Sequence, residues 1–219
     1  MHSTAQRQRR RKPMSRQDAK EHTRRALKRA ALKLLSQSSF DALSLREVTR
    51  EAGVSPTAFY RHFGDTEELG LELVEEAFGT MRAMLRVARS DPTMTSNAIN
   101  RSVEIVTEHV AHHNDHMRFV LRERHGGMRR IRQAIRRELR LLTDELAIDL
   151  AAFEALTDWG AGDRRMLADL LVSSMVTATG ELLDARGEVQ REIAQRASKQ
   201  LRLVVLGASL WTIPPPAKE

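Results

Sequence analysis

Apolar residues recur at helical spacing through most of the chain, and short polar breaks divide this pattern into segments. In the first segment Leu27, Ala30, Ala31 and Leu34 lie three or four positions apart, which places them on one face of a helix. Runs of alternating β-branched and aromatic residues are missing, so strands are not expected. The pattern predicts an all-α fold. The expected helices cover residues 15–36, 45–52, 56–63, 65–89, 95–112, 115–124, 128–153, 161–185 and 188–211.

Two short helices near the N-terminus have clear start and stop signals. Ser44 and Glu47 have the spacing of a capping box, and Gly53 suits the left-handed backbone that ends a helix. Ser55 and Pro56 then begin the second helix, because proline is tolerated at the first helical position. Two short helices around a tight glycine turn are typical of a helix-turn-helix, whose second helix enters the major groove of DNA. An ordinary helical hairpin is the alternative.

The second short helix is expected to present a polar outer face to DNA. Phe59 and Phe63 are four positions apart and would face the core, which leaves Thr57 and Arg61 free to read base edges. Neighbouring side chains have donors suited to phosphate contacts, which position the protein without reading sequence. The predicted DNA-binding residues are Arg7, Arg9, Arg10, Arg11, Ser44, Arg46, Ser55, Pro56, Thr57, Ala58, Tyr60, Arg61 and His62.

Positive charge is concentrated at the N-terminus. Residues 1–30 carry eleven Lys and Arg and two acidic residues, whereas the rest of the chain carries a small negative charge within a total of +7. Such asymmetry favours an anionic partner. Residues 1–14 contain almost nothing apolar, so a disordered basic arm is expected, and it could enter the adjacent minor groove. A solubilising tail is the alternative, whereas membrane binding is disfavoured because the arm lacks an apolar face.

The composition also excludes several classes of protein. The chain has no cysteine, no segment typical of a signal peptide and no apolar run of about 20 residues, so a cytoplasmic protein without membrane contact is expected. Glycine-rich phosphate loops and nucleophile elbows are missing, and we expect neither an enzyme nor a bound cofactor. A metal enzyme built on His109, His112, His113 and His116 is a disfavoured alternative. These residues could share a helix face, but no glutamate completes a zinc-hydrolase motif.

Several motifs resemble the DNA-binding domain of TetR-type bacterial repressors, across about residues 16–75. The stretches that carry the resemblance are Leu45-Arg46-Glu47-Val48, Ala52-Gly53-Val54-Ser55, Phe59-Tyr60-Arg61-His62-Phe63 and Glu68-Leu69. The resemblance implies three DNA-binding helices, a helical ligand-binding domain, and a homodimer that joins through its last two long helices and binds a palindromic operator on double-stranded DNA. Many members have lysine where Thr66 stands, so backbone N–H groups at that helix start would have to contact the phosphate instead.

A finer resemblance extends over nearly the whole chain. Phe119-Val120-Leu121-Arg122-Glu123-Arg124 and the Gly126-Gly127 pair, together with the N-terminal motifs, look like the FabR and DesT group of regulators. That resemblance implies control of unsaturated fatty acid synthesis and sensing of long-chain acyl-CoA or acyl carrier protein thioesters. A sensor of drugs or other hydrophobic effectors is the alternative. The expected organisation is a basic arm at 1–14, a DNA-binding domain at 15–64, a ligand and dimer domain at 65–213 and a tail at 214–219.

The second domain has apolar faces broader than a two-helix contact requires. They could line an effector pocket, although a packed core without a cavity is equally compatible with the pattern. The candidate lining residues are Phe78, Met81, Leu85, Phe119, Arg122, Arg124, Ile131, Ile135, Leu139, Leu171 and Met175, with the arginines facing the phosphates of an acyl-CoA. The candidate dimer residues are Ala168, Leu171, Val172, Met175, Leu201, Val204, Val205 and Ala208.

Overall fold

The computed structural model describes residues 15–89, 96–153 and 156–211, and in these ranges every regular element is helical. The all-α prediction is therefore confirmed. In chain order the elements are α1 (Arg16–Leu35), the 3-10 turn η1 (Phe40–Ala42), α2 (Leu45–Ala52), α3 (Pro56–Phe59), α4 (Thr66–Arg89), α5 (Ser96–His112), α6 (Asn114–Glu123), α7 (Arg129–Leu150), α8 (Ala161–Asp184) and α9 (Gly187–Ser209).

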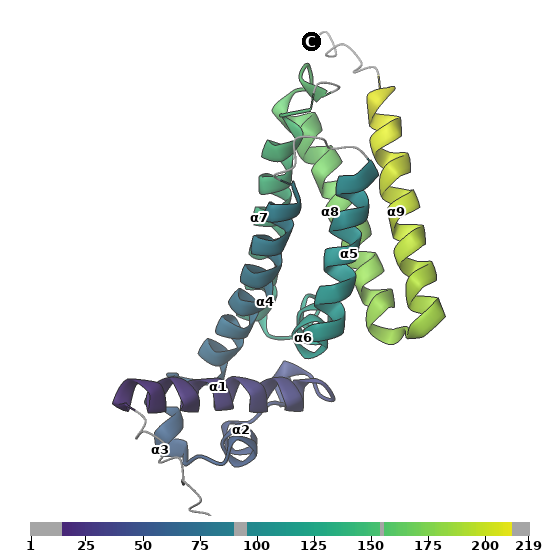
Figure 1. Ribbon diagram of the computed structural model, residues 1–219. Helices are drawn as coiled ribbons and strands as arrows, with labels where there is room; N and C mark the ends of the chain where they lie inside the picture. Colours follow the sequence, from purple (N-terminus) through teal and green to yellow (C-terminus); the bar gives the residue numbers. More distant parts are fainter. Residues whose placement is uncertain (1–14, 90–95, 154–155, 212–219) are drawn as a thin grey trace, which may run out of the picture.

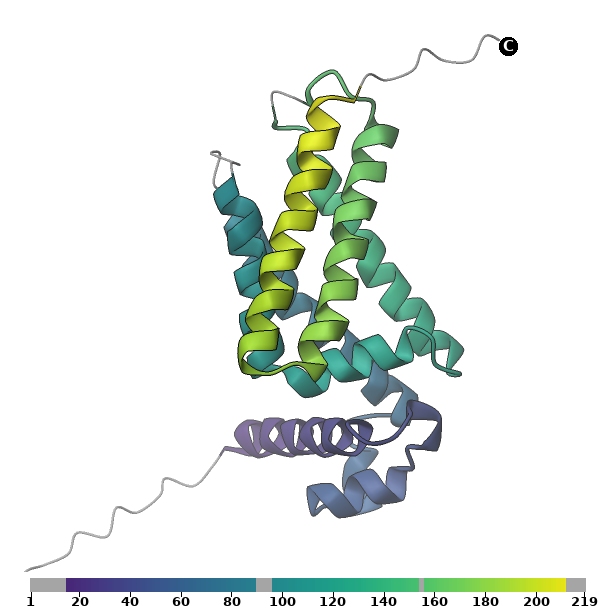
Figure 2. The ribbon, with the colours of Figure 1, turned by 90° about the vertical axis from the view of Figure 1, so that its right-hand side faces the viewer.

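The helices form a small unit and a larger bundle that are joined by one long helix. Figure 1 shows α1, α2 and α3 at one end of the molecule, with α4 rising from them into the bundle made by α5 to α9. Helices α8 and α9 form an antiparallel pair on one side of the bundle, where they face the viewer in Figure 2. The short helix α6 lies at the base of the bundle, next to α1.

The helix ends follow the local signals in the sequence. Ser44 and Glu47 make both hydrogen bonds of a capping box, and Gly53 ends α2 with a φ of 67°. The Ser55 side chain accepts from the backbone of Ala58 at the start of α3. Two expected ends are wrong. Helix α7 stops at Leu150 rather than at 153. Helix α3 stops at Phe59 rather than at 63, because the following residues tighten into turns with bonds such as His62 N to Phe59 O at 2.8 Å.

One hydrophobic cluster connects the small unit with the bundle. It contains Leu27 of α1, Phe59 of α3, Leu73 of α4 and Ile135 of α7, all buried. At its centre the ring of Phe40, in η1, lies 6.0 Å from that of Phe119 in α6. The domain boundary expected near residue 64 remains a prediction, but apolar packing crosses it.

A second cluster holds α8 and α9 against the rest of the bundle. Helix α8 is long and apolar enough to cross a membrane by length and composition, the one such helix among the residues described. It packs against α5, α7 and α9, and its Leu167, Ala168 and Leu171 are buried in the cluster. Helix α8 is therefore a core helix of the bundle.

Candidate nucleic-acid interface and ligand cavity

Helix α3 is positioned by two buried aromatic rings. Phe59 and Phe63 are at most 1% exposed, and their ring centroids are 5.6 Å apart. Val48 of α2 is buried in the same cluster, and the guanidinium of Arg24 in α1 lies 4.5 Å from the centroid of the Phe63 ring. Because Phe59 points inward, Thr57 and Tyr60 are left on the outside of the turn.

The outer face of α3 offers several free side chains. Ser55, Pro56, Thr57, Tyr60 and Arg61 are exposed, and Ala58 is partly buried. Tyr60 is 63% exposed, which is unusual for an aromatic side chain in a small helical unit. Arg46 on α2 is also exposed, and within the described residues neither it nor Arg61 has an ion-pair partner. These groups remain available to a polyanion.

Two of the predicted DNA-binding residues, Ser44 and His62, are less available to DNA than the others. The Ser44 hydroxyl donates to Oε2 of Glu47 at 2.7 Å and accepts from its backbone N–H, so the hydroxyl proton is used by the helix cap. The Nδ1 atom of His62 is buried without a partner among the described residues. Burial, followed by the charges of Arg24, Lys20 and Arg61, lowers the pKa of His62, so it is a neutral group rather than a cation. The predicted arm residues Arg7, Arg9, Arg10 and Arg11 lie outside the described residues.

The start of α4 does not replace the missing lysine at Thr66. The Asp65 carboxylate already accepts from the backbone of Glu68 at 2.7 Å, and Glu67 and Glu68 add two more acidic groups to the first turn. This arrangement is favourable for the helix but repels a phosphate. The expectation that backbone N–H groups there take a phosphate is therefore not supported.

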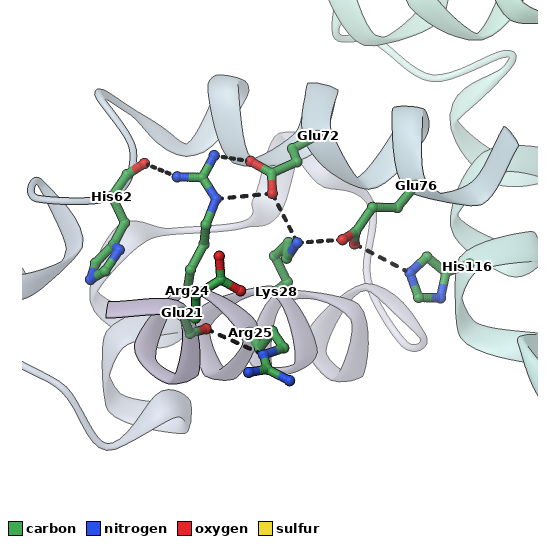
Figure 3. A network of polar contacts seen from close by, with 8 residues as sticks. All are labelled: Glu21, Arg24, Arg25, Lys28, His62, Glu72, Glu76 and His116. Carbon is green, nitrogen blue, oxygen red and sulfur yellow. Dashed lines mark hydrogen bonds and ion pairs between the residues drawn. The ribbon is translucent and has the colours of Figure 1, made fainter. Parts of the chain in front are cut away.

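A network of charged side chains connects the segment after α3 with α1 and α4 (Figure 3). Arg24 forms a two-point ion pair with Glu72 and donates from Nη1 to the carbonyl oxygen of His62 at 2.8 Å. Lys28 lies between Glu72, at 2.8 Å, and Glu76. The polypeptide just after α3 is thereby attached to both neighbouring helices.

The network of charged side chains continues into the bundle through α6. Nε2 of His116 lies 3.9 Å from Oε2 of Glu76. Contact with His116 lowers the pKa of Glu76, against the effect of burial and with further help from Lys28. Burial alone would raise the pKa of Glu72, but hydrogen bonds from Arg24 and Lys28 outweigh it and lower that pKa. This network could not be read from the sequence, because the carboxylates that meet Lys28 lie more than forty positions away on α4.

A largely apolar cavity of about 440 Å³ runs through the bundle. Its lining on α8 extends from Leu167 to Thr179, twelve positions apart, which corresponds to about 18 Å at roughly 1.5 Å per helical residue. Helix α7 lines it over a similar stretch, from Ile135 to Leu150. The cavity is therefore elongated along the bundle, a shape that suits an extended hydrocarbon chain. Of the two alternatives left open by the sequence, the structure has the cavity rather than a fully packed core.

Most of the predicted pocket residues line this cavity, and three do not. The lining includes Phe78, Met81, Leu85, Arg124, Ile135, Leu139, Leu171 and Met175. Phe119 instead packs on Phe40, and Ile131 lies against Gly70 of α4. Phe119 and Ile131 therefore point away from the cavity, toward η1 and the start of α4. The spacing of apolar residues does not show which side of a helix faces the cavity.

Arg122 also faces away from the cavity, toward α1. Its guanidinium donates to the carbonyl oxygens of Leu35 at 2.9 Å and Ser38 at 2.7 Å, just where α1 ends. The adjacent Glu123 is buried and accepts from the backbone of Phe40 at 2.9 Å. The Arg122 side chain is therefore a helix cap and not a group that faces a ligand.

A second set of lining residues was not anticipated. The apolar members lie at the far end of the cavity, on α7, on the segment that follows it, and on α9: Leu146, Leu150, Phe153, Leu156, Val205 and Leu206. The polar members are Ser102, Thr179 and Arg202. A run of leucines at helical spacing signals burial but does not distinguish a lining residue from a core residue, so the sequence could not single them out.

The four histidines considered as metal ligands do not converge on one site. His109 is buried and stacks on His113 with ring centroids 4.6 Å apart, His112 contacts the carbonyl of Glu108, and His116 contacts Glu76. Burial first, and then the charges of the other three histidines, lower the pKa of His109 to about 4. Across the described ranges no group of three or more His, Asp or Glu is arranged to hold a metal ion.

Apolar side chains remain exposed on α8 and α9. The large ones are Met166, Leu170, Val189, Leu203 and Leu206, and Leu210 follows directly after α9. They differ from the predicted dimer residues: Ala168, Leu171, Leu201 and Ala208 are buried inside the bundle, and Val172, Met175, Val204 and Val205 are partly buried. Both helices use one apolar face for the core of the bundle, and the predicted dimer residues lie on or beside that face, so their role in a dimer remains a prediction.

Comparison with protein families assigns the N-terminal part of the chain. Residues 27–73 match the model of the bacterial regulatory proteins of the tetR family. The match covers the C-terminal part of α1, all of α2 and α3 and the start of α4, which are the elements around the exposed face of α3.

Solved structures share the fold over most of the chain at low sequence identity. The fatty acid degradation regulator FadR from Bacillus halodurans is 14% identical, with a TM-score of 0.69 over 82% of this chain and 94% of that one. A TetR-family transcriptional regulator from Streptomyces coelicolor is 16% identical, with a TM-score of 0.68 over 86% and 97%. SmeT in complex with triclosan is also 16% identical, with a TM-score of 0.66 over 90% and 99%.

Proposed function

We propose that this chain, a TetR-family transcriptional regulator and not an enzyme, is a repressor whose hold on DNA responds to a long-chain acyl thioester such as acyl-CoA. The observation that carries this proposal is the long apolar cavity, whose walls include α4 and α6. A second point of support is the FadR structure, since that protein is described as a regulator of fatty acid degradation. The finer kinship with FabR and DesT, and control of fatty acid desaturation or synthesis genes, belong to the same proposal.

The DNA-binding part of the proposal rests on the exposed face of α3. Thr57 and Arg61 are exposed at the tip of the unit and would meet base edges, whereas Arg46 would contact phosphate. A homodimer would place two such faces on the half-sites of a palindromic operator, and the exposed leucines of α8 and α9 would form its bundle. The proposed setting is the cytoplasm.

The mechanism follows from the position of the cavity. Phe78, Met81 and Leu85 of α4 line it, and the same helix reaches Glu72 and the charged network beside α3. The shape of the bound chain would set how α4 packs on the bundle, and thereby the separation of the two recognition faces. The change in DNA affinity cannot exceed the preference of the effector for one of the two states.

A drug sensor is the second candidate, because the structure of SmeT contains triclosan in a similar fold. The two are separated by titrating the protein with oleoyl-CoA, palmitoyl-CoA and free CoA while following heat and the fluorescence of Trp159, which lies in the cluster beside the cavity. Saturable binding of one acyl-CoA per subunit, with little binding of CoA alone, is the expected result. Failure of both thioesters to bind would remove the acyl-thioester assignment and leave other hydrophobic effectors, drugs among them.

The DNA interface is tested on an operator selected from random sequence. Arg46→Ala should weaken binding to all sequences and reduce the salt slope by about one, whereas Thr57→Val should change base preference. If neither substitution affects binding, the recognition face has been misplaced.

A further inference from the structure

Arg202 of α9 has an unusual position in the wall of the cavity. It is one of two arginines that line the cavity within the described residues, and the other, Arg124, lies on α6. Its Nη2 donates to Oδ1 of Asn100 at 2.9 Å, but its Nε is buried and has no hydrogen-bond partner among the described residues. Buried N–H groups of charged side chains nearly always have an acceptor, so the Nε of Arg202 requires one from outside the protein.

The surroundings of Arg202 limit which kind of ligand could supply this acceptor. The side chain separates the cavity from a surface hollow between α5 and α9. That hollow is lined by Glu104 and Glu108 as well as Lys199 and Arg202, so its charges balance and it offers no excess of cations to a group with several phosphates. On the inner side the Ser102 hydroxyl lines the same cavity and makes no hydrogen bond within the described part of the chain, which adds a second free donor.

We infer that Arg202 anchors the carboxylate of a free long-chain fatty acid, with the hydrocarbon chain in the apolar remainder of the cavity. This inference rests on the repressor and the lipid cavity of the proposed function, but it replaces the acyl thioester with the free acid as the effector. A planar guanidinium with a free N–H is the preferred protein partner of a carboxylate, and the bond is charge-assisted. A thioester carbonyl could accept the same N–H, but its CoA phosphates would then lie beside the acidic residues of the hollow.

The test measures binding of oleate, oleyl alcohol and oleoyl-CoA, below the concentration at which each forms micelles. It uses the full chain and three variants: Arg202→Met, Arg202→Lys and Lys199→Met. Lys199→Met is the matched control, because Lys199 lies on the same helix and lines the outer hollow but not the cavity. Circular dichroism and the melting temperature verify that each variant folds.

The expected result is a preference of the unaltered chain for oleate over oleyl alcohol. Arg202→Met should weaken oleate binding by about 10- to 100-fold, the effect of losing one charge-assisted hydrogen bond, and change alcohol binding by less than about threefold. Arg202→Lys should recover part of the loss, and Lys199→Met should bind as the unaltered chain does.

Three results would overturn the inference. Equal affinity of the unaltered chain for the acid and the alcohol would do so without any variant. Equal losses of oleate affinity in Arg202→Met and Lys199→Met would also overturn it, because they would indicate only a general effect of positive charge. Binding of oleoyl-CoA without binding of oleate would leave the proposed function standing and remove the role of Arg202, whereas binding of neither would remove both.

Discussion

Nη1 of Arg122 in α6 lies 2.9 Å from the carbonyl oxygen of Leu35, the last residue of α1. The last carbonyls of a helix have no partner within the helix, and a cation there also favours the helix dipole. On its other side α6 presents Val120 and Leu121 to the cavity. One short helix therefore contacts both α1 and the cavity of the bundle.

Replacing Arg122 should weaken the communication between these two parts. We expect Arg122→Met to lower the free energy of unfolding by about 1–2 kcal/mol through loss of the cap. Effector affinity should stay within about threefold, since Arg122 does not line the cavity, while the effect of the effector on DNA affinity becomes smaller. DNA titrations with and without effector measure this change. The control is Arg129→Met, at an exposed position, and an unchanged effector response in Arg122→Met would contradict the prediction.

Arg24→Met tests how firmly α3 is held. The substitution removes the ion pair with Glu72, the bond to the His62 carbonyl and the contact with the Phe63 ring. We expect about a tenfold loss of operator affinity at fixed salt, since about 1.4 kcal/mol of positioning energy corresponds to that factor. Arg25→Met removes the same charge from the exposed neighbour and should lose much less. Equal losses in the two variants would mean that only charge matters at this end of α1.

Two glycines of α4 should respond to alanine in opposite directions. A methyl group at Gly70 would overlap the buried ring of Phe40 and come within 2.8 Å of Cδ1 of Ile131, so Gly70→Ala should destabilise the chain by about 1–3 kcal/mol. A methyl group at Gly79 meets nothing within 4 Å, and Gly79→Ala should stabilise the helix by about 0.5–1 kcal/mol. Urea denaturation of both variants measures the two effects. A stable Gly70→Ala would show that Phe40 can move aside.

His109 should make stability depend on pH. Its pKa falls from 6.5 in the unfolded chain to about 4 in the fold, so the unfolded state binds the proton first as pH falls. Stability should be complete above pH 6.5 and should decline between pH 6.5 and 4, by at most about 1.4 kcal/mol per unit. His109→Leu should reduce that slope, as measured by urea denaturation at several pH values. His112→Leu, at an exposed position, serves as the control, and equal slopes in all three chains would contradict the assignment.

The exposed leucine at 203 provides a test of the dimer. Leu203 on α9 is 70% exposed, and burial in a partner would explain an apolar side chain in that position. We expect Leu203→Glu to weaken self-association by at least about tenfold in sedimentation experiments, since each 1.4 kcal/mol is a factor of ten. Ile148→Glu changes an equally exposed apolar residue on α7 and should leave association unchanged. Greater weakening by Ile148→Glu would place the interface elsewhere.

The local signals in the sequence predicted the helices well. Serine caps and glycine stops depend on neighbours within four residues, so the capping box of Ser44 and the left-handed Gly53 could be recognised before any packing was known. The end of α3 was missed by four residues, because the tight turn after Phe59 follows from how Phe63 and Arg24 pack and not from local preference.

The direction of a side chain around its helix was harder to predict. Arg122 and Arg124 are two positions apart in one basic motif, yet one caps α1 and the other lines the cavity. Residues two apart point to nearly opposite sides of a helix, but which side meets which neighbour depends on tertiary packing. Arg202 could not be found for the same reason: its significance comes from an unpaired Nε in a cavity, and a sequence does not show which donors lack acceptors.

The shared cluster around Phe40 and Phe119 has a thermodynamic consequence. Apolar packing runs without interruption from α1 to α7, so the DNA-binding unit has no separate core to melt on its own. Heating should therefore give a single cooperative transition in which near-ultraviolet signals from both ends of the molecule disappear together. A ligand that fills the distant cavity would then raise the melting temperature of the recognition helix as well, because all of these helices belong to one unfolding unit.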